Sequence, residues 1–202
     1  MPRQVDHESR RRRIADAVCR LADEHGLEGV TLRDVAARAD VSMGAVQRCF
    51  RTKEEMLVFA LAHVGEAVSA RIGERLAQDG TSGVDPRAEL EHAAAEISLV
   101  SPERRAEARV WLAFVAQAAV TPSLAGLLRD NYRELHGLFS RLLDAAGAGE
   151  PRRAAHALLA LADGLTTHVL IGHLTPEAAR EVLDDHLRGI PGHQGAALGA
   201  CN

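Results

Sequence analysis

Apolar residues recur at helical spacing along nearly the whole chain, and no stretch alternates between apolar and polar residues as a strand would. A first helix is expected over residues 9–25, with Ser9 as its N-cap and Gly26 directly after its end. The apolar positions that define this helix are Ile14, Val18, Leu21 and Ala22. The pattern predicts an all-α fold of about nine helices.

Two short helices and one long helix follow the first. Thr31 is placed to cap a helix that runs to Ala39, with Asp34 three residues later in the position of a capping-box carboxylate. Asp40 stands at the turn, where Asp tolerates left-handed backbone geometry, and Ser42 begins the next short helix, which ends near Phe50. A long helix is then expected over residues 53–79.

The clearest loop is DGTSGVDP, at residues 79–86. Four proline-containing starts (SPE, TPS, GEP and TPE) mark later helices, because proline is tolerated in a first helical turn. These later helices are expected over residues 87–99, 103–120, 123–146, 151–172 and 176–188. We predict a helix-turn-helix domain at 1–52, an antiparallel helical bundle for ligand binding and dimerisation at 53–190, and a flexible tail at 191–202.

The composition is that of an ordinary globular protein, and its charge is unevenly distributed. The 202 residues are 47% hydrophobic, 26% charged and only 3% aromatic, a balance that favours helices. Residues 1–53 carry 11 Lys/Arg and 8 Asp/Glu, a net charge of +3, whereas residues 54–202 carry 13 and 20, a net charge of −7. A basic first quarter on an acidic remainder indicates that one end of the chain meets phosphate.

The remaining chemistry of the sequence argues against several protein classes. The three cysteines, Cys19, Cys49 and Cys201, form no CxxC pair, which fits a reducing cytoplasm. No apolar run approaches the roughly 20 residues that cross a membrane. No HExxH motif, metal-ligand spacing or nucleophile motif is present. We therefore expect no enzymatic activity, no metal, no cofactor and no membrane association.

Residues 31–50, TLRDVAARADVSMGAVQRCF, have the steric pattern of a helix-turn-helix. Ala36 falls where the two helices cross, so that a larger side chain would push them apart. The miniature core is expected to consist of Val35, Ala39, Val41, Val46 and Cys49. The second helix then presents Met43, Gly44, Ala45, Gln47 and Arg48 to a DNA major groove.

Three blocks resemble the TetR family of repressors: RRRRIADAVCRLADEHG, VTLRDVAARADVSMGAVQRCF and RTKEEML. Their spacing is that of the family over about residues 10–60. The resemblance implies that Phe50 packs the recognition helix onto the long helix, and that Thr31 and Lys53 hold phosphates on either side of the groove. One departure is Gln47, where the family often has a Tyr that contacts phosphate.

This departure leaves the readout open. Gln47 reads a base, most naturally adenine, or contacts phosphate, and Arg48 reads guanine or holds a phosphate. The basic run of residues 10–13 is expected to meet phosphate or the minor groove, the alternative being a solvated charged turn. The complete set of predicted DNA-binding residues is Arg10, Arg11, Thr31, Arg33, Ser42, Met43, Gly44, Ala45, Gln47, Arg48 and Lys53.

The C-terminal region is similar to the TetR subgroup that contains the betaine-responsive repressors, in RVWLAFVAQAAVTPSL and LADGLTTHVLIG. This similarity implies a bundle with a ligand cavity and a dimer face made by helices 123–146 and 151–172. Candidate ligand-binding residues are Trp111, Phe114, Gln117, Asn131, Phe139 and His168. Candidate dimer residues are Leu138, Leu142, Leu158, Leu161, Leu165 and Val169. The region offers few aromatic residues for a quaternary-ammonium cage, so a betaine ligand is not implied.

These features predict a cytoplasmic, homodimeric, ligand-responsive repressor. It would bind double-stranded palindromic operator DNA and be released by a small, mostly apolar effector. The effector's signal is expected to reach the DNA-binding domain along helix 53–79 or through the packing of helix 1 against it. The alternative is an activator or a nucleoid-type DNA-binding protein without a small-molecule inducer.

Overall fold

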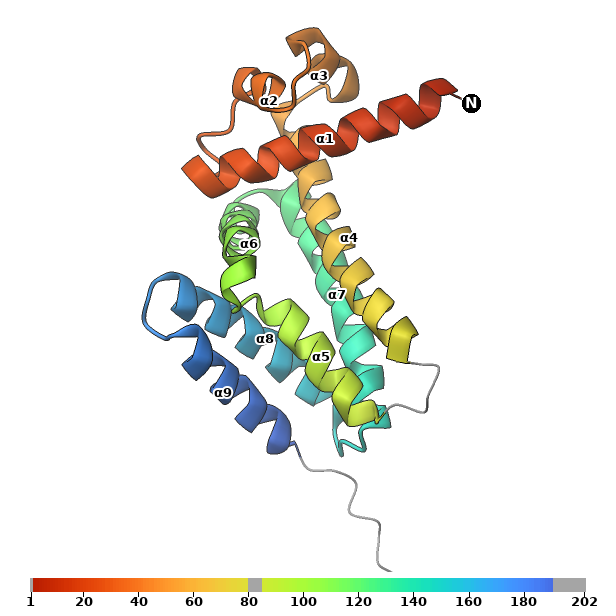
Figure 1. Cartoon of the computed structure of the whole chain (residues 1–202), viewed down its shortest axis with the longest axis vertical. Helices are drawn as coiled ribbons and strands as arrows, with labels where there is room; N and C mark the ends of the chain where they lie inside the picture. Colours follow the sequence, from red (N-terminus) through yellow and green to blue (C-terminus); the bar gives the residue numbers. More distant parts are fainter. Residues whose placement is uncertain (1, 80–84, 191–202) are drawn as a thin grey trace, which may run out of the picture. The chain divides into compact units, whose positions relative to one another are not determined.

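A computed structural model describes residues 2–79 and 85–190 of the chain, with side chains for residues 7–74 and 85–190. Within these residues it contains nine α-helices, one short 3-10 helix and no strand, which confirms the all-α prediction (Figure 1). The helices are α1 Pro2–His25, α2 Leu32–Arg38, α3 Met43–Cys49, α4 Lys53–Asp79, α5 Pro86–Ser98, α6 Arg105–Ala118, α7 Pro122–Ala145, α8 Pro151–Leu170 and α9 Pro176–Arg188. The 3-10 helix, η1, spans Pro102–Arg104. The predicted tail at 191–202 lies outside the described residues, as does most of the predicted loop.

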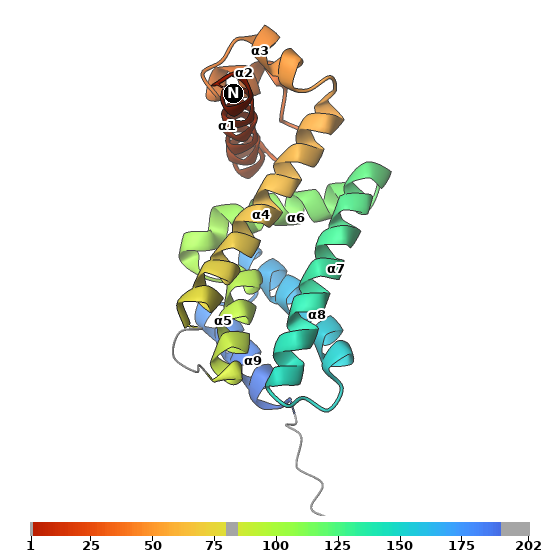
Figure 2. The same cartoon turned by 90° about the vertical axis from the view of Figure 1, so that its right-hand side faces the viewer.

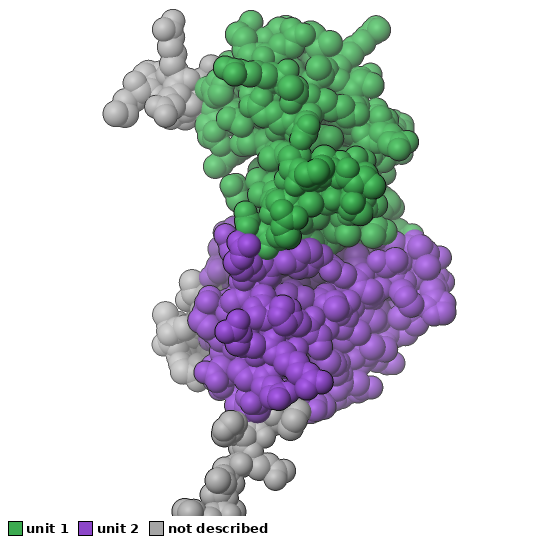
Figure 3. All heavy atoms as spheres, turned by 180° about the vertical axis from the view of Figure 1, so that it is seen from behind, with its two compact units in different colours: residues 1–69, 103–131 green, residues 70–102, 132–202 purple. Residues whose placement is uncertain are grey.

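The chain packs as two compact units (Figure 3). Unit 1 comprises residues 1–69 and 103–131, and unit 2 comprises residues 70–102 and 132–202. Helices α4 and α7 therefore each contribute residues to both units. Unit 1 contains α6 and the start of α7 in addition to the helix-turn-helix, so the packing boundary does not follow the predicted functional boundary at residue 52. The division of roles at that boundary stays a prediction.

Helix ends follow the local signals in the sequence, with one exception. Helix α1 begins at Pro2, so Ser9 lies inside the helix and the prediction that it is the N-cap is wrong. Gly26, with a φ of 69°, ends α1 as expected, because glycine adopts the left-handed conformation without steric penalty. The four proline signals begin η1, α7, α8 and α9. The helix expected from residue 103 thus opens with a 3-10 turn before α6 continues it.

Unit 1 is built around α1, which packs against α2, α3 and α6 (Figures 1 and 2). The predicted apolar stripe of α1 is buried in its core. Helix α4 contributes Met56, Ala60, Leu61 and Val64 to the same core. The stretch Lys53–Glu74 of α4 is long and apolar enough to cross a membrane by length and composition alone, so the expectation that no apolar run approaches that length is wrong. One third of that stretch is buried in the structure.

In unit 2, α5, α8 and α9 pack against one another (Figures 1 and 2). Its buried side chains include Leu90, Phe139, Leu143, Leu158, Leu183 and Leu187. Thr166 is also buried, and its hydroxyl donates toward the carbonyl oxygens of Ser98 and Ala162. Ser98 ends α5, where Leu99 takes a left-handed φ of 48°. The threonine therefore satisfies a backbone oxygen at a helix end that the fold has buried.

Candidate nucleic-acid interface

Helices α2 and α3 form the predicted helix-turn-helix in unit 1. Asp40 has a φ of 53°, and the Val41 amide donates to the Ala36 carbonyl oxygen at 3.0 Å to close the turn between them. Ala36 is buried at the helix crossing, as its small size predicted. Val35, Ala39, Val46 and Cys49 are buried around it and Val41 is half-buried. The miniature core expected from the sequence is confirmed.

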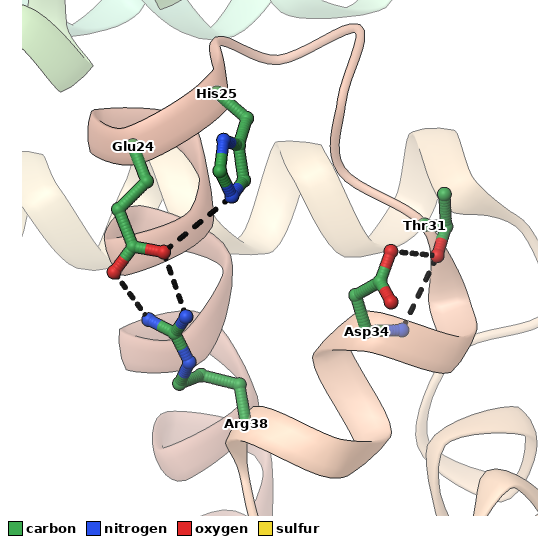
Figure 4. Close-up of polar contacts among 5 residues, drawn as sticks. All are labelled: Glu24, His25, Thr31, Asp34 and Arg38. Atoms are coloured by element: carbon green, nitrogen blue, oxygen red, sulfur yellow. Dashed lines mark hydrogen bonds and ion pairs between the residues drawn. The ribbon is translucent and has the colours of Figure 1, made fainter.

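Both helices of the motif are capped by hydroxyls. The Ser42 oxygen accepts from the Ala45 amide at 3.2 Å, and the Thr31 oxygen accepts from the Asp34 amide at 3.2 Å. The Thr31 hydroxyl also donates to the Asp34 carboxylate at 2.6 Å, as Figure 4 shows. In a reciprocal capping box the carboxylate would accept from the backbone amide of the cap residue instead. A phosphate would therefore have to displace Asp34 to receive the Thr31 hydroxyl proton, whereas the Ser42 hydroxyl keeps a proton to donate.

The outer face of the recognition helix α3 carries three of the predicted base-reading side chains. Met43 is 42% exposed, and Gln47 and Arg48 are also exposed. Gly44 is half-buried, and a Cβ added there would lie 3.5 Å from an Arg48 guanidinium nitrogen, so Arg48 extends back across the glycine. The expectation that Ala45 is exposed is wrong, because only 7% of it is exposed. Ala45 shares the inward face of the helix with Val46 and Cys49, one turn away.

A bidentate ion pair fastens the end of α1 to the end of α2 (Figure 4). The Arg38 guanidinium donates to both carboxylate oxygens of Glu24, at 2.6 and 2.7 Å. These hydrogen bonds lower the pKa of Glu24 and raise that of Arg38. The imidazole of His25 lies 3.6 Å from the same carboxylate. This ion pair could not be predicted from the sequence, because no local signal pairs residues 14 positions apart in separate helices.

Phe50 lies at the junction of α3 and α4. Its backbone amide caps α3, its side chain is buried, and its ring centroid is 5.4 Å from that of Phe59 on α4. This contact confirms that Phe50 packs the recognition helix onto α4. Arg11 of α1 places its guanidinium over both rings.

The other predicted phosphate contacts lie around the helix-turn-helix. Arg33 is exposed on α2, and Arg10 is half-buried on α1. The half-buried Lys53 begins α4, with its ammonium 3.5 Å from the Glu28 carbonyl oxygen. Together with the exposed residues of α3, they supply positive charge and hydrogen-bond donors within unit 1.

The predicted ligand-binding residues do not form one cluster within either unit. Trp111, Phe114, Gln117 and Asn131 belong to unit 1, whereas Phe139 and His168 belong to unit 2. Phe114 and Phe139 are fully buried, and the other unit 1 members are half-buried. His168 is exposed, with its ring 4.9 Å from that of His173.

Described residues of each unit line a hollow. One, of about 450 Å³ in unit 1, is lined by Gln117 and Thr121 beside Lys53 and the leucines 27, 57 and 124. Gln117 donates to the Thr121 hydroxyl at 2.9 Å across its wall. The other, of about 570 Å³ in unit 2, lies between the first turns of α8 and the end of α9. Gln117 therefore lies near the loop that precedes α2 and the first turns of α4.

The predicted dimer residues are mostly part of the core of unit 2. Leu142, Leu158, Leu165 and Val169 are buried, and Leu138 and Leu161 are half-buried. The opposite side of α8 is exposed, with small residues along its middle and Ile171, 70% exposed, just beyond its end. The exposed positions of α8 are Arg152, Arg153, His156, Ala157, Ala160, Gly164 and His168.

Family models match both ends of the chain. Residues 14–58 match the model described as bacterial regulatory proteins of the tetR family, and residues 86–192 match that of the BetI-type transcriptional repressor C-terminal region. The chain is 35% identical over 197 residues to the transcriptional regulator BetI of Burkholderia mallei, covering 93% of this chain and 96% of that one. The chain belongs to the TetR family.

Solved structures of TetR-like regulators have the same fold. A transcriptional regulator of Rhodococcus sp. Rha1 superposes with a TM-score of 0.79 at 36% identity, covering 89% of this chain and 95% of that one. A regulator of Saccharomonospora viridis in complex with choline superposes with a TM-score of 0.80 at 24% identity, covering 90% and 97%. This TetR-family protein is a transcriptional regulator and not an enzyme.

The DNA-binding helices of this TetR-family chain contact more of unit 1 than α4 alone. Asp23 of α1 forms an ion pair with Arg109 of α6, and Ser123 of α7 donates to the carboxylate of Glu54 on α4. Helix α6 also packs against α1. The expectation that a signal must travel through α4 or its packing with α1 is therefore too narrow, because α6 and the start of α7 contact the same helices directly.

Proposed function

We propose that this TetR-family regulator is a repressor that binds an inverted-repeat operator as a homodimer and is released by a small, mostly apolar effector. The observation that carries the proposal is the outer face of α3, where Gln47 and Arg48 are exposed on a helix held at both ends. The similarity of residues 86–192 to the BetI-type repressor model supports the repressing role. Such a protein would act in the cytoplasm, where the DNA is.

The base contacts are assigned to the exposed side chains of α3. Gln47 would make a bidentate contact with adenine, and Arg48 one with guanine, or either would hold a phosphate. Arg33, Ser42 and Lys53 would contact the backbone and set the register of α3 in the groove. Ala45 no longer belongs to this set, because its methyl group faces the interior.

The dimer follows from the need for two recognition helices on two half-sites. We assign the contact to the exposed side of α8, where Ala157, Ala160 and Gly164 would let a partner helix approach closely. The leucines predicted for the interface would support this side from within, since Leu158 and Leu165 are buried in the subunit. His168, predicted as a ligand residue, lies on the same exposed side and is assigned to the dimer contact.

The effector is assigned to the apolar residues of α6 and α7, with Trp111, Asn131 and Gln117 as the polar groups that would orient it. The choline complex of the Saccharomonospora neighbour supports a small-molecule effector as a class. The Asn131 amide lies against Gly65, since a Cβ added there would be 3.1 Å from its nitrogen. A ligand that moves α7 at this point would move α4 with it, and α4 begins directly after the recognition helix.

Selection of bound duplexes from a random pool tests this function most simply. The expected product is a short inverted repeat with half-sites about 34–36 Å apart, centre to centre. A small molecule that raises the thermal stability of the protein should then weaken its operator affinity, and by linkage the operator should weaken its binding equally. Recovery of unrelated sequences would favour a nucleoid-type protein, and activation of a reporter from the selected site would favour an activator.

A further inference from the structure

Arg11 contacts both aromatic rings that join the recognition helix to α4. Its guanidinium carbon lies 4.2 Å from the centroid of the Phe59 ring and 4.9 Å from that of the Phe50 ring. The two rings are tilted by 52° to each other, so the cation lies against both faces at once. Since Phe50 directly follows α3 and Phe59 belongs to α4, one side chain of α1 touches both elements.

The surroundings of Arg11 differ from those of a phosphate-binding side chain, which is solvated before DNA binds. Its Nε atom is buried and has no hydrogen-bond partner. A long basic side chain that served only phosphate would keep its charged head in water. Ring faces attract a cation more strongly when the pair is desolvated, and the planar, weakly hydrated guanidinium stacks where an ammonium does not. The aromatic contact thus compensates for the hydrogen bond that Nε lacks.

We propose that Arg11 is a positioning residue, which locks the C-terminal end of the recognition helix against α1 and α4 before DNA arrives. The place of Arg11 in the basic run of residues 10–13 predicts a phosphate contact, whereas the geometry gives it a different role. This inference rests on the proposed binding of a specific operator. A recognition helix held in place loses less conformational freedom on binding, and this advantage matters only where α3 must fit base edges.

Two substitutions separate positioning from phosphate binding. Arg11→Lys keeps the charge but loses the planar stack, and Arg11→Gln loses both. If Arg11 positions α3, each variant lowers operator affinity about tenfold, an effect of the size of a desolvated cation–π contact. Affinity for a scrambled duplex stays within twofold, and the slope of log affinity against log salt is unchanged. Arg20→Gln, which removes an exposed charge from the same helix, should leave operator affinity within twofold.

A double-mutant cycle with Phe59→Leu tests the contact itself. Because Phe59 is the nearer of the two rings, Arg11→Gln should lower operator affinity by a smaller factor when Phe59 is already replaced than in the unaltered protein, and the contact with Phe50 accounts for what remains. In Arg11→Lys, amide hydrogens of α3 should exchange faster while those of α8 and α9 do not, which separates local loosening from general unfolding.

A phosphate contact would give the opposite pattern. Lysine would then restore affinity, Arg11→Gln would weaken operator and scrambled DNA alike, and the salt slope would shift by about 0.9. That outcome, or additive effects in the cycle, overturns the positioning role while leaving specific binding intact. If the unaltered protein itself binds operator and scrambled DNA equally, the proposed function has failed instead.

Discussion

The two sides of α8 predict opposite consequences for substitutions only two residues apart. Leu158 is 0% exposed in the core of unit 2, whereas Ala160 is exposed on the side assigned to the dimer. Leu158→Ala leaves a cavity in a packed core and should cost about 2–5 kcal/mol of unfolding free energy. For a chain of this length that is a loss of roughly 4–20 °C in Tm. The folded fraction should remain dimeric.

Ala160→Glu should have the opposite effect: the subunit keeps its stability and the dimer is lost. Both residues favour helix, so the free energy of unfolding of the isolated subunit should change by no more than about 0.5 kcal/mol. In the dimer, two carboxylates without partners would be buried between close helices, at several kcal/mol each, which raises the dissociation constant at least about a thousandfold. Light scattering at micromolar concentration should therefore show a folded monomer.

Ala116→Glu on α6 is the matched control, because it places the same charge on another exposed helical position. It should stay dimeric. If Ala160→Glu remains a dimer while its helical content and Tm are normal, the α8 side is not the interface.

Three further predictions concern the helix-turn-helix and the core of unit 2. In competition binding, Gln47→Ala should reduce base preference at one operator position by about 1–3 kcal/mol. Lys53→Ala should weaken binding to all duplexes alike, and a changed sequence preference in this variant would contradict these roles. Asp40→Val should lower Tm by a few degrees relative to Asp40→Gly, since a β-branched residue at positive φ costs about 1–2 kcal/mol; equal Tm values would mean the turn is not strained. Thr166→Val keeps the shape of the side chain but leaves the buried Ser98 carbonyl oxygen without its donor. The free energy of unfolding, measured with denaturant, should fall by about 1–3 kcal/mol, and an unchanged midpoint would refute the contact.

The sequence predicted what depends on neighbouring residues. The caps Thr31 and Ser42, the left-handed Asp40 and the proline-led helices all appear in the structure, because each reflects the steric or hydrogen-bonding needs of a few consecutive residues. The small Ala36 at the helix crossing could be found in the same way. A larger side chain there would push the two helices apart, and the nearly fixed spacing of the motif identifies the position.

The sequence could not predict contacts between distant segments. The Glu24–Arg38 clamp and the ion pair between Asp23 and Arg109 join helices that no periodicity relates. Arg11 looked like part of a basic run because its aromatic neighbours lie 39 and 48 positions later in the chain. Periodicity identified the buried side of α8 but could not say whether a neighbouring helix of the same subunit or of a partner covers it.

One titration tests most directly whether α3 reads a specific DNA sequence. The selected inverted repeat and a scrambled duplex of equal length are titrated with the protein at physiological salt. A specific TetR-family regulator should bind the repeat at least about a thousandfold more tightly, with one dimer per duplex. Equal affinity for the two duplexes, with both weakening in parallel as salt rises, would contradict the claim.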